Sequence, residues 1–261
     1  MTSGVVLTAL LAASTGLFLQ AEQHLQTLNG SCSVTATANE AEVDLRLERG
    51  ACQGSEHCSS TQTQQPLSAF LGFTLADLQR EGAHVDAVIR AEAGTITCSG
   101  AVRDGRLSGA FNFVPDPAFA DRMLQLGYRD LDEEKLQAYT LFRIGIDWVR
   151  SLQVAGVSGM DSGNLIALRI FHADTDYIHS LNALGYPAPD AEKLIALRVH
   201  RVDAEEVKQI RALGYQPTLD ELIQMRIFKI TPDFIHRMQA RGLDHLTISK
   251  LVQIRIFNLA D

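Results

Sequence analysis

A short run of potential metal ligands stands out in the middle of the chain: His172, Asp174, Asp176 and His179. Imidazole and carboxylate side chains are ligands that a divalent transition metal could use. The same residues also fit the start of a helix, because one aspartate caps free amides and a second favours the helix dipole. This second interpretation requires no ligand, so we predict no metal site and no cofactor.

The four cysteines are the other residues with chemistry of their own: Cys32, Cys52, Cys58 and Cys98. An even number in an exported chain indicates disulfides, with three connectivities open. Cys52 and Cys58 bracket a polar loop, which favours a local bridge between them. Cys32 and Cys98 fall in the apolar phase of two predicted strands, where they form either a bridge across the sheet or two buried thiols. The spacings contain no CxxC pairs, which argues against a zinc site.

Sequence signatures of common active sites are absent. The chain contains no HExxH, GxSxG, P-loop or GxGxxG motif. Its formal net charge of −8 also argues against a nucleic-acid surface. We therefore expect a non-enzymatic protein that does not bind nucleic acid, and we assign no catalytic residue.

An internal repeat covers more than half of the chain and predicts how its elements are arranged. Five glycines recur at intervals of 29, 29, 29 and 28 residues: Gly127, Gly156, Gly185, Gly214 and Gly242. Each follows an apolar run and precedes another apolar residue, which is typical of a Schellman helix end. A fixed period in this range indicates a solenoid.

Capping residues divide every unit into two short helices. An Asp or Thr begins the first helix, and a second cap follows in the next half of the unit. The predicted caps are Asp132, Asp161, Asp190, Thr218 and Thr247 for the first helices, and Asp116, Gly145, Asp174, Asp203 and Thr231 for the second. Thr218 and Glu221 also form a capping box. We predict ten helices, from one near 117–126 to one near 248–257, which must stack to be stable because each is short.

The first helix of a unit repeats the pattern Leu-x-x-apolar-Arg-apolar-aromatic or His. Its arginines are Arg169, Arg198, Arg226 and Arg255. They form either a basic stripe for an anionic partner or a set of structural donors to neighbouring helix carbonyls and acidic caps. Because the chain is acidic overall, we favour the structural role.

Positions that differ between units are free to carry a binding surface, because the repeated apolar residues must be buried. In the turns and on the second helices, these positions hold Arg129, Arg150, His179, Lys208 and His236. We expect these five residues to form the surface for a protein partner, since repeat arrays present extended surfaces for binding.

The chain before the repeat predicts a small antiparallel β domain over residues 28–114. Val43, Leu45 and Leu47 alternate with charged residues, as in a half-buried strand. Similar segments give about five strands in all, with Asp104-Gly105 as a hairpin turn. We expect residues 51–65 to be a long polar loop and Thr74 to cap one helical turn. The helical array follows over residues 116–261, so the predicted fold class is α+β.

Residues Val5–Leu19 form an apolar segment that is shorter than the ~20 residues of a spanning helix. It is typical of a secretory signal, although no Lys or Arg precedes Arg46. We interpret residues 1–22 as a signal peptide or an N-terminal anchor, which places the protein in the periplasm or outside the cell. If the segment is a core helix instead, the protein is cytoplasmic. Membrane contact is expected only through this segment, if it is not cleaved.

Several phrases of the sequence resemble a known family. Leu194–His200 and Ala212–Tyr215 carry the likeness in the repeat, and Ala93–Thr95 and Arg103–Phe113 carry it in the sheet. Together they resemble the extracytoplasmic C-terminal part of some bacterial membrane zinc metallopeptidases of the antibiotic-sensor type, and free-standing uncharacterised relatives. The peptidase helices and HExxH are absent, so no catalytic residue carries over. The resemblance implies an envelope location and a sensing or scaffolding role.

The expected function is that of a non-enzymatic extracytoplasmic interaction or scaffold module that binds a protein partner. The alternative is an enzyme or small-ligand receptor whose site lies at the junction of sheet and array. A deep pocket there, lined by titratable groups with perturbed pKa values, would favour the alternative. A shallow groove along the helices would favour the interaction module.

Overall fold

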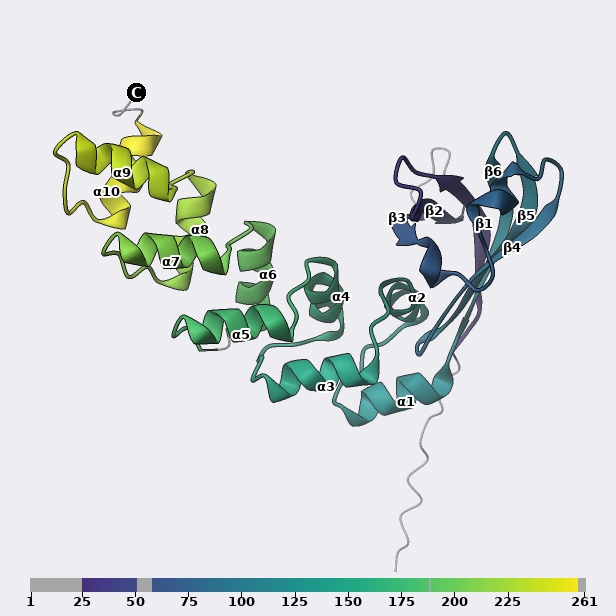
Figure 1. The fold of residues 1–261 in the computed structure, drawn as a ribbon. Coiled ribbons are helices and arrows are strands. Elements are labelled where there is room, and N and C mark those ends of the chain that lie inside the picture. The colour runs from purple at the N-terminus through teal and green to yellow at the C-terminus, as the bar shows by residue number, and fades with distance from the viewer. Residues whose placement is uncertain (1–24, 51–57, 188, 258–261) are drawn as a thin grey trace, which may run out of the picture.

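The computed structural model describes residues 25–50, 58–187 and 189–257, which form an antiparallel sheet followed by a helical array (Figure 1). The α+β fold class predicted from the sequence is confirmed. The apolar segment Val5–Leu19 and Cys52 lie outside the described residues. Among the helices described, none is long and apolar enough to cross a membrane.

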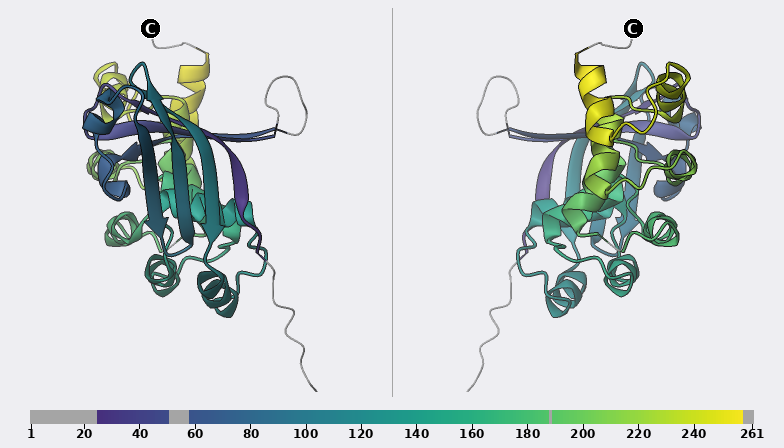
Figure 2. Two further views of the ribbon diagram at one scale, coloured as in Figure 1. Left: turned by 90° about the vertical axis from the view of Figure 1, so that its right-hand side faces the viewer. Right: turned by 90° about the vertical axis from the view of Figure 1, so that its left-hand side faces the viewer.

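Within the described residues, six strands form one antiparallel sheet in the order β3-β2-β1-β6-β5-β4. Their bounds are β1 (Leu28–Ala36), β2 (Glu42–Arg49), β3 (Ser59–Pro66), β4 (His84–Ala91), β5 (Gly94–Arg103) and β6 (Arg106–Pro115). β2 and β3 run across the direction of β4, β5 and β6, so the sheet is strongly twisted (Figure 2). Two 3₁₀ turns, Leu67–Ala69 and Leu75–Gln79, connect β3 to β4. Thr74 caps the second turn, as predicted.

The strand β3 corrects the sequence interpretation, which expected about five strands and a loop over residues 51–65. It pairs with β2 along its whole length, from Arg49 opposite Ser59 to Glu42 opposite Pro66. Its Ser, Thr and Gln side chains show no apolar alternation, and Gln65 is its one buried residue. An edge strand of this kind is held mainly by main-chain hydrogen bonds. The pattern of its side chains therefore does not predict it.

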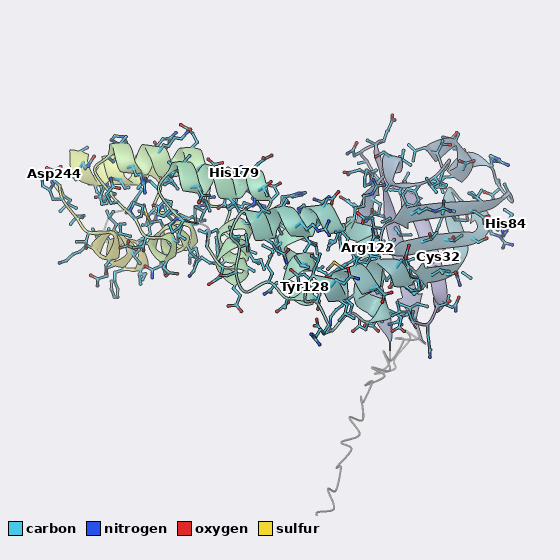
Figure 3. All side chains as sticks on the ribbon, turned by 90° about the horizontal axis from the view of Figure 1, so that it is seen from below. Cys32, His84, Arg122, Tyr128, His179 and Asp244 are labelled. Carbon is cyan, nitrogen blue, oxygen red and sulfur yellow. A yellow bond between two sulfur atoms is a disulfide. The ribbon has the colours of Figure 1, made fainter. Side chains whose placement is uncertain are left out.

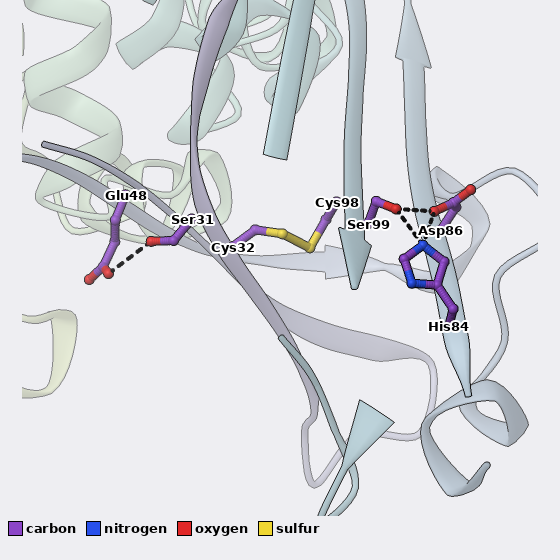
Figure 4. Close-up of a disulfide and its surroundings, with 7 residues drawn as sticks. All are labelled: Ser31, Cys32, Glu48, His84, Asp86, Cys98 and Ser99. Carbon is purple, nitrogen blue, oxygen red and sulfur yellow. Dashed lines mark hydrogen bonds and ion pairs between the residues drawn. A yellow bond between two sulfur atoms is a disulfide. The ribbon is translucent and has the colours of Figure 1, made fainter. Parts of the chain in front are cut away.

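A disulfide joins Cys32 of β1 to Cys98 of β5, with Cα atoms 5.9 Å apart (Figure 4). These strands are not neighbours, since β6 runs between them. Cys32 lies opposite Gly109 of β6, which in turn lies opposite Gly100 of β5. A Cβ atom at Gly109 would come within 2.0 Å of the Ser99 carbonyl oxygen, so the close approach of β6 to β5 at this point requires glycine. Of the two alternatives for Cys32 and Cys98, the bridge is the one formed.

Ten helices make up the described part of the array, and each predicted N-cap occupies its cap position. They are α1 (Pro117–Gln125), α2 (Glu133–Phe142), α3 (Ile146–Val154), α4 (Ser162–Ile170), α5 (Thr175–Ala183), α6 (Ala191–Val199), α7 (Ala204–Ala212), α8 (Leu219–Ile227), α9 (Pro232–Ala240) and α10 (Ile248–Ile256). The predicted capping box of Thr218 and Glu221 is present at α8.

The helices alternate between two rows of a curved array (Figure 1). The inner row consists of α2, α4, α6, α8 and α10, which stack on one another on the concave side that faces the sheet. The outer row consists of α1, α3, α5, α7 and α9. The first inner helix, α2, packs against β4, β5 and β6 and so joins the array to the sheet. Tyr139 of α2 is fully buried and meets the Phe119 ring of α1 edge-on, with the ring centres 6.2 Å apart.

Candidate functional site

The inner helices end differently from the outer ones. Each outer helix is followed by a repeat glycine with φ between 78° and 100°, as the Schellman pattern predicts. The inner helices α2, α4, α6 and α8 turn instead at Arg143, His172, Arg201 and Lys229, with φ of 52° to 55°. The left-handed region costs a residue with a side chain about 1–2 kcal/mol, which glycine would avoid. Basic groups suit a helix C-terminus through the dipole, but the choice of side chain over glycine indicates a further use.

Each of these basic residues ends a triplet that we call a rung: an apolar residue, an aromatic residue or histidine, and the basic residue. The four rungs are Leu141-Phe142-Arg143, Ile170-Phe171-His172, Val199-His200-Arg201 and Ile227-Phe228-Lys229. Ile256 and Phe257 hold the first two places in the last unit, but the third residue there is Asn258, which is not basic and lies outside the described part of the chain. Because the inner helices stack on one another, the rungs follow in series along the inner row.

The apolar residue of the rung is exposed in every unit except the first. Ile170, Val199, Ile227 and Ile256 expose 42%, 45%, 50% and 50% of their surface, whereas Leu141 exposes 3%. All five occupy the same position of an inner helix, so the difference comes from the surroundings. The sheet covers α2, and no described part of the chain covers the other four side chains to the same extent.

The first rung lies beside the end of β3, while its helix α2 packs against β4, β5 and β6. Gln65 and Pro66 line the same groove as Leu141 and Phe142, a space of about 420 Å³ between the sheet and helices α2 and α4. The Arg143 Nη2 atom donates a hydrogen bond to the carbonyl oxygen of Ser68 at 3.4 Å. Arg143 thus links the first rung to the 3₁₀ turn Leu67–Ala69 that follows β3.

The repeat arginines connect each rung to the next unit. The Nε atoms of Arg169, Arg198 and Arg226 donate to the carbonyl oxygens of Phe142, Phe171 and His200, at 3.0, 2.8 and 3.1 Å. Each acceptor is the middle residue of the preceding rung. Arg169, Arg198 and Arg226 therefore act as structural donors to carbonyl oxygens of a neighbouring helix, and they do not form a free basic stripe.

The five residues expected to bind a partner lie elsewhere. Arg129 is in the turn before α2, and the other four occupy one repeated position of the outer helices: Arg150, His179, Lys208 and His236. All five are exposed, and His179 is labelled on α5 in Figure 3. Lys208 bonds Glu205 of its own helix at 3.0 Å. The structure thus places four of the five on the outer row and Arg129 in a turn, whereas the rungs lie on the inner row. The sequence analysis did not predict the rungs. The signal that could have revealed them is the recurrence of Ile170, Val199 and Ile227 at spacings of 29 and 28 residues.

The His172–His179 run acts as a helix start in the structure. Asp174 is the N-cap of α5, where its Oδ1 atom accepts a hydrogen bond from the Tyr177 amide at 3.1 Å. Throughout the described ranges, no group of three or more His, Cys, Asp or Glu side chains is arranged to hold a metal ion.

A cluster of His84, Asp86 and Ser99 on β4 and β5 was not foreseen from the sequence (Figure 4). The His84 Nε2 atom lies 2.9 Å from the Ser99 hydroxyl, which donates in turn to Asp86. In a hydrolase triad the histidine stands between serine and carboxylate, whereas here the serine stands between the other two. His84 and Asp86 side chains are 72% and 58% exposed, so water is not excluded. We interpret the cluster as a cross-strand polar contact.

Comparison of the chain with models of protein families, with curated proteins and with solved structures found no match.

Proposed function

We propose that this protein is a non-enzymatic interaction or scaffold module of the bacterial envelope, which binds a protein partner through its helical array. The observation that carries the proposal is the series of exposed apolar residues Ile170, Val199, Ile227 and Ile256 on the concave row. Burial of such side chains contributes about 1.5–3 kcal/mol each, and the same position is buried where the sheet covers it. The Cys32–Cys98 disulfide supports an oxidising compartment such as the periplasm.

The junction of sheet and array supports a small-ligand or catalytic site less well. Its groove is lined by Glu42, Arg143, Arg169 and His172 together with apolar residues. Arg143 and Arg169 each bond a main-chain carbonyl oxygen. In the part of the chain that the structure describes, Glu42 and His172 form no hydrogen bond or ion pair with each other, so no acid–base pair is assembled there.

Photocrosslinking in the envelope fraction tests the proposal. The full chain carries a photoreactive group at Ile170, and the captured protein is identified by mass spectrometry. We expect Val199→Asp with Ile227→Asp to reduce its capture at least about tenfold, because binding would bury two carboxylates against an apolar surface.

Lys208→Glu with His236→Glu is the matched control on the outer row, and circular dichroism checks the fold of both variants. Loss of capture in the outer variant alone would move the partner surface to Arg150, His179, Lys208 and His236. Capture that survives both variants and is lost on deletion of residues 28–115 would contradict the proposal, because the array would then be a spacer.

A further inference from the structure

Resting on the proposed function, we infer that a pocket near the far end of the array binds the guanidinium group of an arginine side chain from the protein partner. The pocket has a volume of about 460 Å³ and lies between the turns that precede α8 and α10. Tyr215 and Gln239 line it, together with Asp244, which is labelled at the end of the array in Figure 3. Its volume is in the range of pockets that bind small ligands.

The preceding unit of the repeat holds a guanidinium in the equivalent place. Tyr186 and Tyr215 each follow a repeat glycine, and Arg211 and Gln239 each lie three residues before the next one. The Arg211 guanidinium lies 4.7 Å from the centre of the Tyr186 ring, and its Nη1 atom donates to the carbonyl oxygen of Leu184. In that unit an arginine therefore covers the tyrosine ring and bonds the main chain just before the glycine.

The next unit has the same surroundings without the arginine. Gln239 is shorter and uncharged, and it lines the pocket beside Tyr215. Leu213 holds the place of Leu184 and lines the pocket as well. Within the described residues, neither the Tyr215 hydroxyl nor the Gln239 amide group forms a side-chain hydrogen bond. The groups that hold Arg211 in one unit thus recur in the next, where they are open to an arginine from outside.

The charge of the pocket favours a cation. Among its described lining residues, Glu221 and Asp244 are carboxylates, His245 carries an imidazole, and none is Lys or Arg. The Glu221 Oε2 atom accepts a hydrogen bond from the Thr218 amide at 2.8 Å, whereas Asp244 forms no ion pair or side-chain hydrogen bond with any described residue. A planar guanidinium stacks on an aromatic ring while its N–H groups donate to oxygens in the ring's plane, which the compact ammonium of lysine does less well. The pocket therefore suits arginine better than lysine.

N-acetyl-arginine amide is the probe. N-acetyl-citrulline amide is its neutral control of similar shape, and N-acetyl-lysine amide is the control with the other cation. NMR titration of the ¹⁵N-labelled full chain should show saturable shifts of the Gly214 and Tyr215 amide signals with the arginine derivative. The dissociation constants of both controls should be at least about tenfold higher.

Gln239→Arg tests the pocket from within, because its side chain should fill the pocket as Arg211 fills the equivalent space. It should abolish binding of the arginine derivative and leave the melting temperature unchanged or raised, since arginine is a good helix former. Gln224→Arg adds the same charge on α8 outside the pocket and should leave binding unchanged. Tyr215→Leu keeps an apolar side chain but removes the ring, so binding should weaken about tenfold.

Equal binding of the arginine and citrulline derivatives, or binding that survives Gln239→Arg in the folded chain, would overturn the inference. Gln239→Arg should also reduce crosslinked capture of the partner, and unchanged capture would overturn the partner as the source of the arginine. If Val199→Asp with Ile227→Asp abolishes capture but the arginine derivative does not bind, only the inference fails. If the derivative binds as expected but that aspartate pair leaves capture unchanged, the proposed apolar surface fails and the pocket stands.

Discussion

At the residue scale, the repeat arginines are held by two kinds of neighbour at one position of the outer helices. Arg169, Arg198 and Arg255 lie over the rings of Trp148, Tyr177 and Phe234, at 5.3, 4.8 and 4.7 Å from the ring centres. In the remaining unit the position holds Glu206, which pairs with Arg226 at 2.7 Å. A ring face and a carboxylate both attract a guanidinium, so the exchange preserves the contact. Arg169, Arg198 and Arg226 also each donate a hydrogen bond to the preceding rung.

Tyr177 gives a prediction at this scale, because its buried hydroxyl donates to the Val202 carbonyl oxygen at 3.0 Å. Tyr177→Phe should lower the free energy of unfolding by about 1–2 kcal/mol near neutral pH, since it leaves that acceptor without its partner. Burial raises the pKa of Tyr177 to about 12, although nearby Arg198 acts in the opposite direction.

Because the folded-state pKa is the higher one, this stabilisation is present below the unfolded pKa of about 10 and is lost as pH rises towards 12. Urea denaturation of wild type and Tyr177→Phe across this range should show the difference shrinking. A difference that grows with pH would contradict the assigned role.

At the scale of the element, the glycines have unequal roles. Gly156 follows α3 with φ 84°, where only glycine is unstrained. Gly163 lies inside the first turn of α4, where a Cβ atom would meet only the Asp161 carboxylate, at 3.3 Å. Gly163 is therefore not required by the backbone geometry, and it lowers the stability of α4.

We expect Gly163→Ala to raise the free energy of unfolding by about 0.5–1 kcal/mol, because alanine restricts the unfolded chain and favours the helix. The amides of α4 should then exchange more slowly with solvent. Gly156→Ala is the matched control and should cost about 1–2 kcal/mol, because its φ is positive. Thermal melts and hydrogen exchange of both variants decide the matter. Destabilisation of similar size in the two would show that the Asp161 cap cannot adjust.

At the scale of the whole molecule, the sheet and the ten helices of the described residues form a continuous core through α2. The disulfide acts on the sheet end of this core, where it links residues 66 positions apart in the sequence. A bridge over so long a loop restricts the unfolded chain strongly.

Cys32→Ala with Cys98→Ala should therefore lower the free energy of unfolding by about 2–4 kcal/mol. Chemical denaturation measures the loss, and the denaturant slope tells whether the array unfolds with the sheet. Addition of a reductant should destabilise the wild type but have a smaller effect on the variant. An unchanged midpoint in the variant would mean that the bridge contributes no net stability.

Local chemistry in the sequence determined the array. Caps, glycines and apolar periodicity act within a few residues, so they specify where each helix begins and ends whatever surrounds it. The strands with alternating apolar residues could also be predicted from the sequence. The strand β3 could not, because its stability comes from main-chain pairing with β2. The possible bridge between Cys32 and Cys98 was visible as one alternative. Which alternative forms depends on how closely the folded sheet brings Cys32 of β1 and Cys98 of β5 together, and their Cα atoms lie 5.9 Å apart.

The candidate site was decided only by the tertiary structure. Leu141 and Ile170 hold the same place in the repeat, and nothing in their local sequence tells them apart. One exposes 3% of its surface and the other 42%, because the sheet folds back over α2 and not over α4. Burial is a property of the neighbours that a side chain acquires on folding. A repeated sequence can therefore specify five equivalent positions, while the placement of a second element determines which of them stay open to a partner.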